Sequence, residues 1–263
     1  MPTKLKLGCD PEVFMADLQG HLKSSIGLIG GSKEHPQPLP IGEGFMVQED
    51  NVAMEFNIPP AESAREYVES IQKTLVFLTE GVKNRYGFQI VNLSAASWPE
   101  EELQTPQAQT FGCDPDYNAW TGKKNPRPNA ADKNLRSCGG HVHVGLDKDR
   151  INSVNLIKMM DLYHGVPSVL MDKGELRKEL YGKRGAYRDK PYGVEYRTLS
   201  NFWIFNPKLI DWVWNNTERA VAAVEAQFPI DEYDEPILQA IDNNDKSVAE
   251  YLVKHLKLEV INV

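Results

Sequence analysis

Four short segments of the sequence place acidic, imidazole or guanidinium side chains at alternate positions. They are Asp10-Pro11-Glu12, the stretch from Asp50 to Glu55, Gly139–Gly145 with its His-Val-His core, and Glu195-Tyr196-Arg197. On a β-strand, residues i and i+2 point to the same face of the sheet. If the four segments line one sheet, a single face carries five carboxylates and two imidazoles: Asp10, Glu12, Asp50, Glu55 and Glu195 with His141 and His143.

Such a cluster of carboxylates indicates bound cations. Each uncompensated buried ion costs on the order of several kcal/mol, so five clustered carboxylates cannot all stay ionised in a half-buried place. Two or three divalent ions would supply the missing positive charge. A ligand set made mostly of carboxylate oxygen suits Mg²⁺ or Mn²⁺ better than Zn²⁺, and Mg²⁺ held in this way binds nucleotide phosphates.

A run of basic residues precedes the fourth segment, and it comprises Arg177, Lys178, Lys183, Arg184, Arg188 and Lys190. Guanidinium groups bind phosphate oxygens in a bidentate manner and stabilise charge that develops in phosphoryl transfer. Arg184 and Arg188, together with Arg197, are therefore the candidate catalytic arginines.

Each of these motifs has an ordinary structural interpretation when it is taken alone. Asp10-Pro11-Glu12 is then a solvated strand end, Glu195 and Arg197 form a surface ion pair, and the basic run is a solvated face. The His-x-His pair by itself is a weak metal signal. The four segments in this order are much more specific than any one of them.

The elements that would position these residues follow from hydrophobic spacing and turn residues. Strands are expected over 4–16, 45–47, 52–57, 88–94, 136–146 and 192–199. Ser63 and Glu66 form a capping box that begins a helix over 61–86, and Asn206-Pro207 begins another that runs to about residue 227. Shorter helices are expected over 234–242 and 246–257, and one or two helices over 150–180, broken near Gly165-Val166-Pro167.

Strands separated by helices or long loops favour an α+β fold with a mostly antiparallel sheet. No linker divides the chain, so residues 1–263 are expected to form one domain. The polar, proline-rich segment 97–135 is long enough to be functional. It is the candidate substrate lid, with Asp114, Asp116, Trp120 and Arg127 as its notable residues.

Composition excludes several classes of protein. Lys and Arg number 29 against 37 Asp and Glu in 263 residues, and a net charge of −8 argues against binding of a nucleic-acid backbone. The three cysteines, Cys9, Cys113 and Cys138, imply no disulfide framework and are expected to be buried thiols. With neither a signal peptide nor an apolar span, we expect a cytoplasmic protein with no membrane partner.

The four segments resemble the motifs of carboxylate–amine ligases in the glutamine synthetase and glutamate–cysteine ligase superfamily. Gly8-Cys9-Asp10-Pro11-Glu12 resembles the first-strand motif with its two metal-binding acids. Asp50 and Glu55, followed by Phe56-Asn57-Ile58-Pro59-Pro60, resemble the acid pair before the first long helix. The segments around His141 and Glu195 resemble the Gly-x-His-x-His and Glu-x-Arg strands. The phage-encoded COOH-NH2 ligases are the most similar branch, and the resemblance spans residues 8–201.

The resemblance implies a glutamine synthetase-like catalytic domain, in which a curved, mostly antiparallel sheet has helices packed on one face. It implies metal ligation by one residue set: Asp10, Glu12, Asp50, Glu55, His141 and Glu195. Arg188, Arg197 and His143 would bind ATP, and Arg184 would join the two arginines in catalysis. Asp10 stands where the large relatives usually have Glu, and Glu49 is an alternative to Asp50.

The activity implied by the resemblance is ATP- and Mg²⁺-dependent formation of an amide or peptide bond through an acyl phosphate. The substrates would be a small carboxylate and a small amine, whose identities stay open. The separate N-terminal domain of glutamine synthetases is absent, so a homo-oligomer is left open too. If the chain is phage-encoded, its place is the host cytoplasm. The alternatives are a phosphagen-kinase-like phosphotransferase, a metal-dependent hydrolase, and a non-catalytic protein that binds metal or nucleotide.

Overall fold

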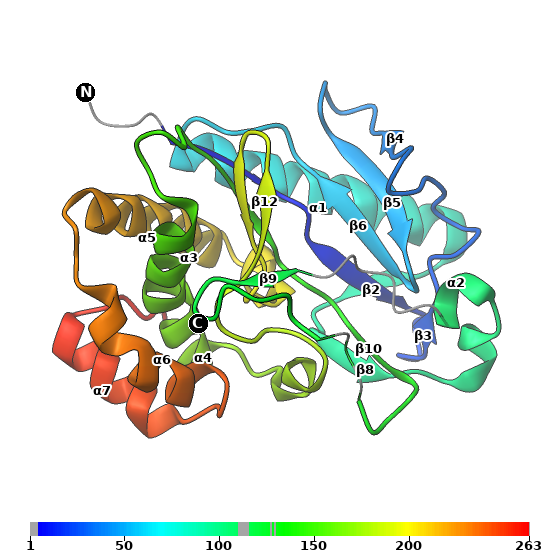
Figure 1. Ribbon diagram of the computed structural model, residues 1–263. Helices are drawn as coiled ribbons and strands as arrows, with labels where there is room; N and C mark the ends of the chain where they lie inside the picture. The colour runs from blue at the N-terminus through cyan, green and yellow to red at the C-terminus, as the bar shows by residue number, and fades with distance from the viewer. Residues whose placement is uncertain (1–4, 110–115, 127, 129, 263) are drawn as a thin grey trace.

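Two antiparallel sheets form the centre of the α+β fold (Figure 1), which we describe from a computed structural model of residues 5–109, 116–126, 128 and 130–262. The first sheet has the strand order β1 (Lys6–Cys9), β11 (Val142–Gly145), β13 (Gly193–Tyr196), β12 (Ala186–Lys190) and β9 (Tyr117–Asn118). The second has the order β3 (Leu22–Lys23), β2 (Glu12–Ala16), β6 (Ala53–Asn57), β5 (Met46–Asp50) and β4 (Gln37–Pro38), and β7 (Gln89–Val91) pairs with β2. A short ladder joins β8 (Ala95–Ser97) to β10 (Leu135–Ser137).

The sheets meet at Asp10-Pro11, where β1 ends in one sheet and β2 begins in the other. A single strand over 4–16 was therefore the wrong expectation. Proline has no N–H to donate to a ladder, which suits it to such a break. The Glu12 N–H donates to Gly139 O at 2.9 Å, and the Phe56 N–H donates to Pro11 O at 3.2 Å, so the corner is fixed from both sides.

The expected helices outside 150–180 are confirmed. The helix α1 (Ala64–Tyr86) begins at Ser63, whose hydroxyl accepts from the Glu66 N–H at 3.2 Å, and ends at Gly87 with φ 70°. The Asn206 side chain caps α5 (Pro207–Glu225) in the same way. The last two helices are α6 (Asp234–Ile241) and α7 (Lys246–Leu256).

The helical stretch after residue 150 is continuous, which corrects the expected break near Gly165-Val166-Pro167. The helix α3 (Ser153–Met160) passes through a π-helical turn (Asp161–Gly165) into α4 (Val166–Met171). A wider π turn accommodates the missing N–H and the ring of Pro167 without ending the helix. A 3₁₀ turn (Glu175–Glu179) follows.

Alternation along β11 explains which side of the first sheet is polar. Val142 and Val144 are fully buried in the main hydrophobic core, which also contains Ile157 of α3 and Ile210 of α5. His143 lies between the two valines in sequence and therefore points to the opposite face. The helices thus cover one face of this sheet and leave the other to polar side chains.

The described part of segment 97–135 is anchored to the protein. The centres of the Trp98 and Phe14 rings lie 5.1 Å apart in an edge-on arrangement, and a 3₁₀ turn (Glu100–Leu103) and α2 (Pro106–Gln109) follow Trp98 in sequence. The Trp120 Nε1–H donates to Asp161 Oδ2 at 2.7 Å. A substrate lid over the whole segment does not fit these contacts. Asp114, Arg127 and Cys113 lie outside the described residues, whereas Cys9 and Cys138 are buried thiols.

No helix in the part of the chain that the structure describes combines the length and the apolar character needed to cross a membrane.

Asp161, in the π turn, joins the helical layer to the back of the first sheet. Its Oδ2 accepts from the Trp120 Nε1–H at 2.7 Å and from the Gly185 N–H at 2.6 Å. Its Oδ1 lies 2.9 Å from the Tyr196 hydroxyl and 3.2 Å from that of Thr198. Because the carboxyl group is fully buried, its pKa is raised to about 7. The Oδ2 partners can only donate, but the hydroxyls at Oδ1 can also accept, so the protonated acid fits the site.

We predict that Asp161→Asn reshapes the pH dependence of stability. In the folded protein Asp161 keeps its proton up to about pH 7, whereas the unfolded chain releases it near pH 3.8. Between these values unfolding releases the proton, so the free energy of unfolding falls as pH rises, by about 1 kcal/mol per pH unit at most. The asparagine amide reproduces the protonated pattern and does not ionise, so the free energy of unfolding of the variant should exceed that of the wild type increasingly from pH 4 to pH 7.

Urea unfolding at several pH values measures this difference. Burial lowers the pKa of His164, in the same turn, to about 4, which stabilises the protein at higher pH in both variants and so cancels in the comparison. Parallel stability curves for the two proteins would show that Asp161 does not carry the effect.

Candidate active site

Three carboxylates on the second sheet form the first cluster. Glu12 of β2 lies directly opposite Glu55 of β6, and Gln48 of β5 lies opposite Glu55 on the other side. Asp50 shares a face with Gln48 because the two are separated by one residue. Carboxylate oxygens of Glu12, Asp50 and Glu55 all lie within 4.8 Å of one another, so the three can share one cation. We call this group the first triad.

The electrostatics of the first triad favour a cation. Burial and the nearby Asp50 charge raise the pKa of Glu12 to about 8, and burial also raises the pKa of Asp50. Hydrogen bonds hold the remaining oxygens in place: the Gly139 N–H donates to Glu12 Oε2 at 2.8 Å, and Gln48 Nε2 donates to Glu55 Oε1 at 2.7 Å. A divalent ion would offset the repulsion that these raised pKa values reflect.

Glu49, the alternative to Asp50, points away from the triad. Its Oε1 accepts from the N–H groups of Gly27 and Gly30 at 2.8 and 2.7 Å. Both glycines have positive φ values, 75° and 76°, which bring their N–H groups toward the carboxylate. The structure therefore brings Asp50, and not Glu49, into the cluster.

A second triad, on the first sheet and the corner beside it, consists of Asp10, His143 and Glu195. His143 lies directly opposite Glu195 across the β11–β13 ladder. His143 Nε2 is 3.1 Å from Asp10 Oδ1 but, among the described residues, has no hydrogen-bond partner, while Tyr192 Oη is 2.7 Å from Nδ1. A buried imidazole nitrogen facing two acids suits a metal ion.

His141 lies beside the second triad and is not one of its three residues. Its Nδ1 is 3.1 Å from Asp10 Oδ1 and 3.8 Å from Glu195 Oε1. Burial and the Arg197 charge lower the pKa of His141 to about 4, so the ring is neutral near pH 7. Gly139 leaves the space that the ring needs, since a Cβ there would lie 2.3 Å from His141 Nε2. The geometry thus favours His143 as the imidazole ligand, whereas the sequence had pointed to His141.

Basic side chains surround Glu195, which is fully buried. Arg197 Nη1 contacts Glu195 Oε1 and lies 3.3 Å from His141 Nδ1, and Arg197 Nε lies 3.4 Å from Asp116 Oδ2. Arg188 Nη1 is 3.6 Å from Glu195 Oε1. The sequence thus named two arginines that do meet at the site, and Asp116 joins them from the segment 97–135.

Arg184 does not lie at either triad, which corrects its expected place beside Arg188 and Arg197. Its guanidinium group contacts Asp234 Oδ1, lies 3.9 Å from Asp242 Oδ2, and is 4.9 Å from the centre of the Trp120 ring. Arg184 precedes β12, and its side chain is committed to α6 and the residue that follows it. These contacts link the segment before β12 to α6.

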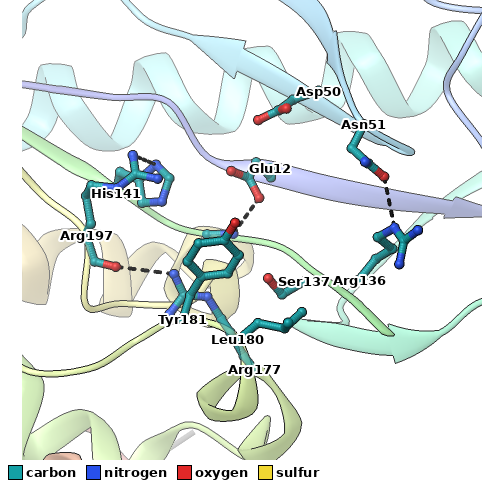
Figure 2. A pocket seen from close by; sticks show the side chains of 11 residues that line it. Glu12, Asp50, Asn51, Arg136, Ser137, His141, Arg177, Leu180, Tyr181 and Arg197 are labelled. Atoms are coloured by element: carbon teal, nitrogen blue, oxygen red, sulfur yellow. Dashed lines mark hydrogen bonds between the residues drawn. The ribbon is translucent and has the colours of Figure 1, made fainter. Parts of the chain in front are cut away.

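A pocket opens between the first triad and a wall of basic residues. Figure 2 shows Glu12 and Asp50 on one side, with Arg177, Leu180 and Tyr181 across from them. Arg177 is 3 % exposed; its Nη1 donates to Thr198 O at 2.9 Å and its Nη2 to Arg197 O at 3.2 Å. Its Nε has no hydrogen-bond partner among the described residues. A buried cation of this kind suits an anionic ligand.

Three residues of this pocket, Arg136, Arg177 and Tyr181, had no role predicted from the sequence. Arg136 donates two hydrogen bonds to Ala108 O and one to Leu135 O, so its charge is held at the pocket wall by backbone carbonyls. Arg177 belonged to the basic run, but only folding brings it, and Tyr181 beside it, to the triad. The position of Arg136 just before the glycine-flanked histidine segment was the one signal available for it.

We predict that the first triad holds one high-affinity Mn²⁺ ion. Glu55→Gln removes one anionic ligand and should weaken that binding by at least about tenfold, because Mn²⁺ prefers carboxylate oxygen. Glu49→Gln is the matched control, since its amide oxygen can still accept from Gly27 and Gly30. Calorimetric titration of each protein without nucleotide measures the effect. Equal loss in both variants, or none in Glu55→Gln, would contradict the assignment.

The chain is similar to one protein family and to solved structures. Residues 131–260 match the family described as phage phiEco32-like COOH.NH2 ligase-type 2. No curated protein matches the sequence. Among solved structures, the chain is similar to a bifunctional glutathione synthetase from Pasteurella multocida, with 12% identity and a TM-score of 0.48 over 97% of this chain. This chain spans about half of that structure, 49% of its length. The family match supports a carboxylate–amine ligase family for the C-terminal half of the chain.

Proposed function

We propose that residues 1–263 form one catalytic domain that joins a small carboxylate to a small amine at the expense of ATP. The observation that carries this proposal is the arrangement of two carboxylate-rich triads on adjoining sheets with Arg197 beside them. Two such clusters suit two divalent ions, and the basic pocket wall suits the anions that the ions would bind. The family match over residues 131–260 supports the same reaction class.

The residues present fit Mg²⁺ or Mn²⁺. Glu12, Asp50 and Glu55 would hold one ion, and Asp10, His143 and Glu195 would hold the other. Five carboxylates and one imidazole form a hard, oxygen-rich ligand set, and burial and the nearby Asp50 charge raise the pKa of Glu12, which a bound cation would oppose. Bound there, the ions would supply Lewis-acid stabilisation of the ATP phosphates.

Arg197 and Arg188 would stabilise the phosphoryl group during its transfer. Both guanidinium groups already lie beside Glu195, within 3.6 Å of its Oε1 in the case of Arg188. Preorganised donors of this type stabilise developing charge without reorganisation. We also propose that Arg177 belongs to this set, because Arg177 lines the pocket and its buried Nε has no hydrogen-bond partner in the described structure.

The pocket beside the first triad would hold the substrate carboxylate. Attack of a carboxylate oxygen on the γ-phosphorus of ATP forms an acyl phosphate and releases ADP. Attack of the amine nitrogen on the acyl carbon then forms the amide, expels phosphate and leaves the amine proton to solvent or phosphate. Arg136 and Arg177 would orient the acid, since together they place two buried cations along the pocket.

The ligase assignment predicts a strict dependence on three substrates. Protein incubated with ATP and Mg²⁺ should release ADP only when both a carboxylate and an amine are present, and the product mass should equal the two minus water. Pools of amino acids and polyamines serve as the first screen. The matched controls omit one substrate at a time.

Other outcomes of that assay would replace the proposal. Product formed without nucleotide would indicate the metal-dependent hydrolase. A phosphorylated acceptor without ligation would indicate the phosphotransferase. Nucleotide binding with no turnover of any pool would indicate the non-catalytic binding protein.

Within the ligase assignment, Arg177→Met should lower kcat by roughly 100-fold or more, the magnitude usual for loss of one preorganised donor. Mn²⁺ binding at the first triad should persist, since Arg177 is not one of its three residues. Arg150→Met is the control, because Arg150 pairs with Glu225 at the surface, at 3.4 Å. Arg177→Lys keeps the charge and should recover part of the rate. A wild-type kcat in folded Arg177→Met would remove Arg177 from the mechanism.

A further inference from the structure

Two residues at the tip of the β12–β13 hairpin contact the two candidate metal ligands that the first sheet contributes to the second triad, Glu195 and His143. Lys190 Nζ lies 2.7 Å from Glu195 Oε2, and Tyr192 Oη lies 2.7 Å from His143 Nδ1. Only Pro191 and Tyr192 separate Lys190 from Gly193. One short turn therefore contacts the carboxylate and the imidazole together.

The strand register explains how Lys190 reaches Glu195. Lys190 lies directly opposite Gly193 in the β12–β13 ladder, and Glu195 is two residues further along β13 on the same face. Gly193 has no side chain, so the Lys190 stem can cross the ladder diagonally, a distance that long side chains span. The Lys190 side chain is 28% exposed, whereas that of Glu195 is completely buried.

Glu195 Oε2 is the atom that makes this contact informative. It is buried and has no hydrogen-bond partner among the described residues, although the Lys190 ammonium lies within ion-pair distance. Glu195 Oε1 is already contacted by Arg197 and is 3.6 Å from Arg188. Because Arg197 already contacts Oε1, Oε2 is the oxygen left for a metal ion shared with Asp10 and His143, and the ammonium group lies against this oxygen.

We propose that Lys190 is an internal counter-ion of the second triad, which a divalent cation must displace in order to bind. An ammonium ion and a metal ion cannot both sit against the same carboxylate oxygen, because their charges repel strongly at this separation. Lys190 therefore lowers the affinity of the second triad for metal while it keeps the buried Glu195 compensated. The inference rests on the proposed function for the identity of the ions.

Once a divalent cation displaces it from Glu195, the Lys190 ammonium group is free to pair with an incoming anion. The Lys190 side chain is partly exposed, so it can turn toward solvent and meet an anion that arrives with the second ion. A nucleotide triphosphate is such an anion, and lysine binds phosphate as a mobile point charge. Lys190 thereby couples occupancy of the second triad to arrival of the nucleotide.

The experiment is a Mn²⁺ titration without nucleotide, followed by calorimetry or by the spin-resonance signal of unbound Mn²⁺. Lys190→Met should tighten the second, weaker Mn²⁺ equivalent by roughly tenfold or more and leave the first unchanged. Lys148→Met is the matched control, since Lys148 Nζ pairs with Asp189 at 2.8 Å on the neighbouring position of the same strand. It loses the same charge and should bind Mn²⁺ as the wild type does.

Two more variants locate the effect. Lys190→Met/Glu195→Gln should lose the tightened equivalent, which places it at the second triad. Lys190→Gln, which keeps a polar side chain, should tighten the second equivalent as well and replaces Lys190→Met if that variant does not fold. Unchanged or weaker binding of the second Mn²⁺ in both single variants would overturn the inference.

The outcome is separable from that of the proposed function. Tightened Mn²⁺ binding in a protein that shows no ligase turnover would reject the function and retain the counter-ion. Ligase turnover in the wild type, together with unchanged Mn²⁺ affinity in the Lys190 variants, would retain the proposed function and reject the counter-ion role of Lys190.

Discussion

The burial of like charges at the junction of two sheets is the constraint on which the rest of the structure depends. Glu12 and Glu195 are 9% and 0% exposed, and uncompensated ions at such positions cost on the order of several kcal/mol each. The two triads differ in how far nearby cations compensate their buried charge. Glu195 has Lys190, Arg188 and Arg197 around it, whereas Glu12 is left with a pKa raised to about 8. The protein alone thus compensates one triad and leaves the other short of positive charge.

Periodicity along single strands predicted much of the site because side-chain direction is a local property. The same-face pairs His141 with His143 and Glu195 with Arg197 follow from the period of two, and both pairs lie at the site. This periodicity could not show which acids belong to which metal-binding cluster. Asp10 and Glu12 belong to different triads, because the corner at Asp10-Pro11 separates the two sheets, and such a corner depends on contacts with Gly139 and Phe56 that are distant in sequence.

The positions of the arginines also depend on tertiary contacts that local sequence does not reveal. The basic run suggested that Arg184 and Arg188 act together, yet β12 carries Arg188 toward Glu195 while the Arg184 side chain pairs with Asp234 and Asp242. Composition cannot separate a guanidinium that holds a helix from one that faces a ligand. Arg177 illustrates the converse, since tertiary folding alone turns it from one residue of a charged run into part of the pocket wall. The helix that continues through Pro167 likewise depends on a π turn that no propensity scale anticipates.

Asp161 is a further buried acid, and it lies behind the first sheet, on the side away from the two triads. It accepts hydrogen bonds from Trp120 and Gly185, and its other oxygen lies against Tyr196, whose neighbours in sequence are Glu195 and Arg197. The strand that presents the carboxylate and guanidinium to the site is therefore held from behind by a second buried acid. Because burial raises the pKa of Asp161 to about 7, this acid adds little negative charge beneath the triads below that pH. Buried acids therefore lie on both sides of β13: Glu195 is compensated by cations, and Asp161, which packs against the back of the strand, stays largely protonated below about pH 7.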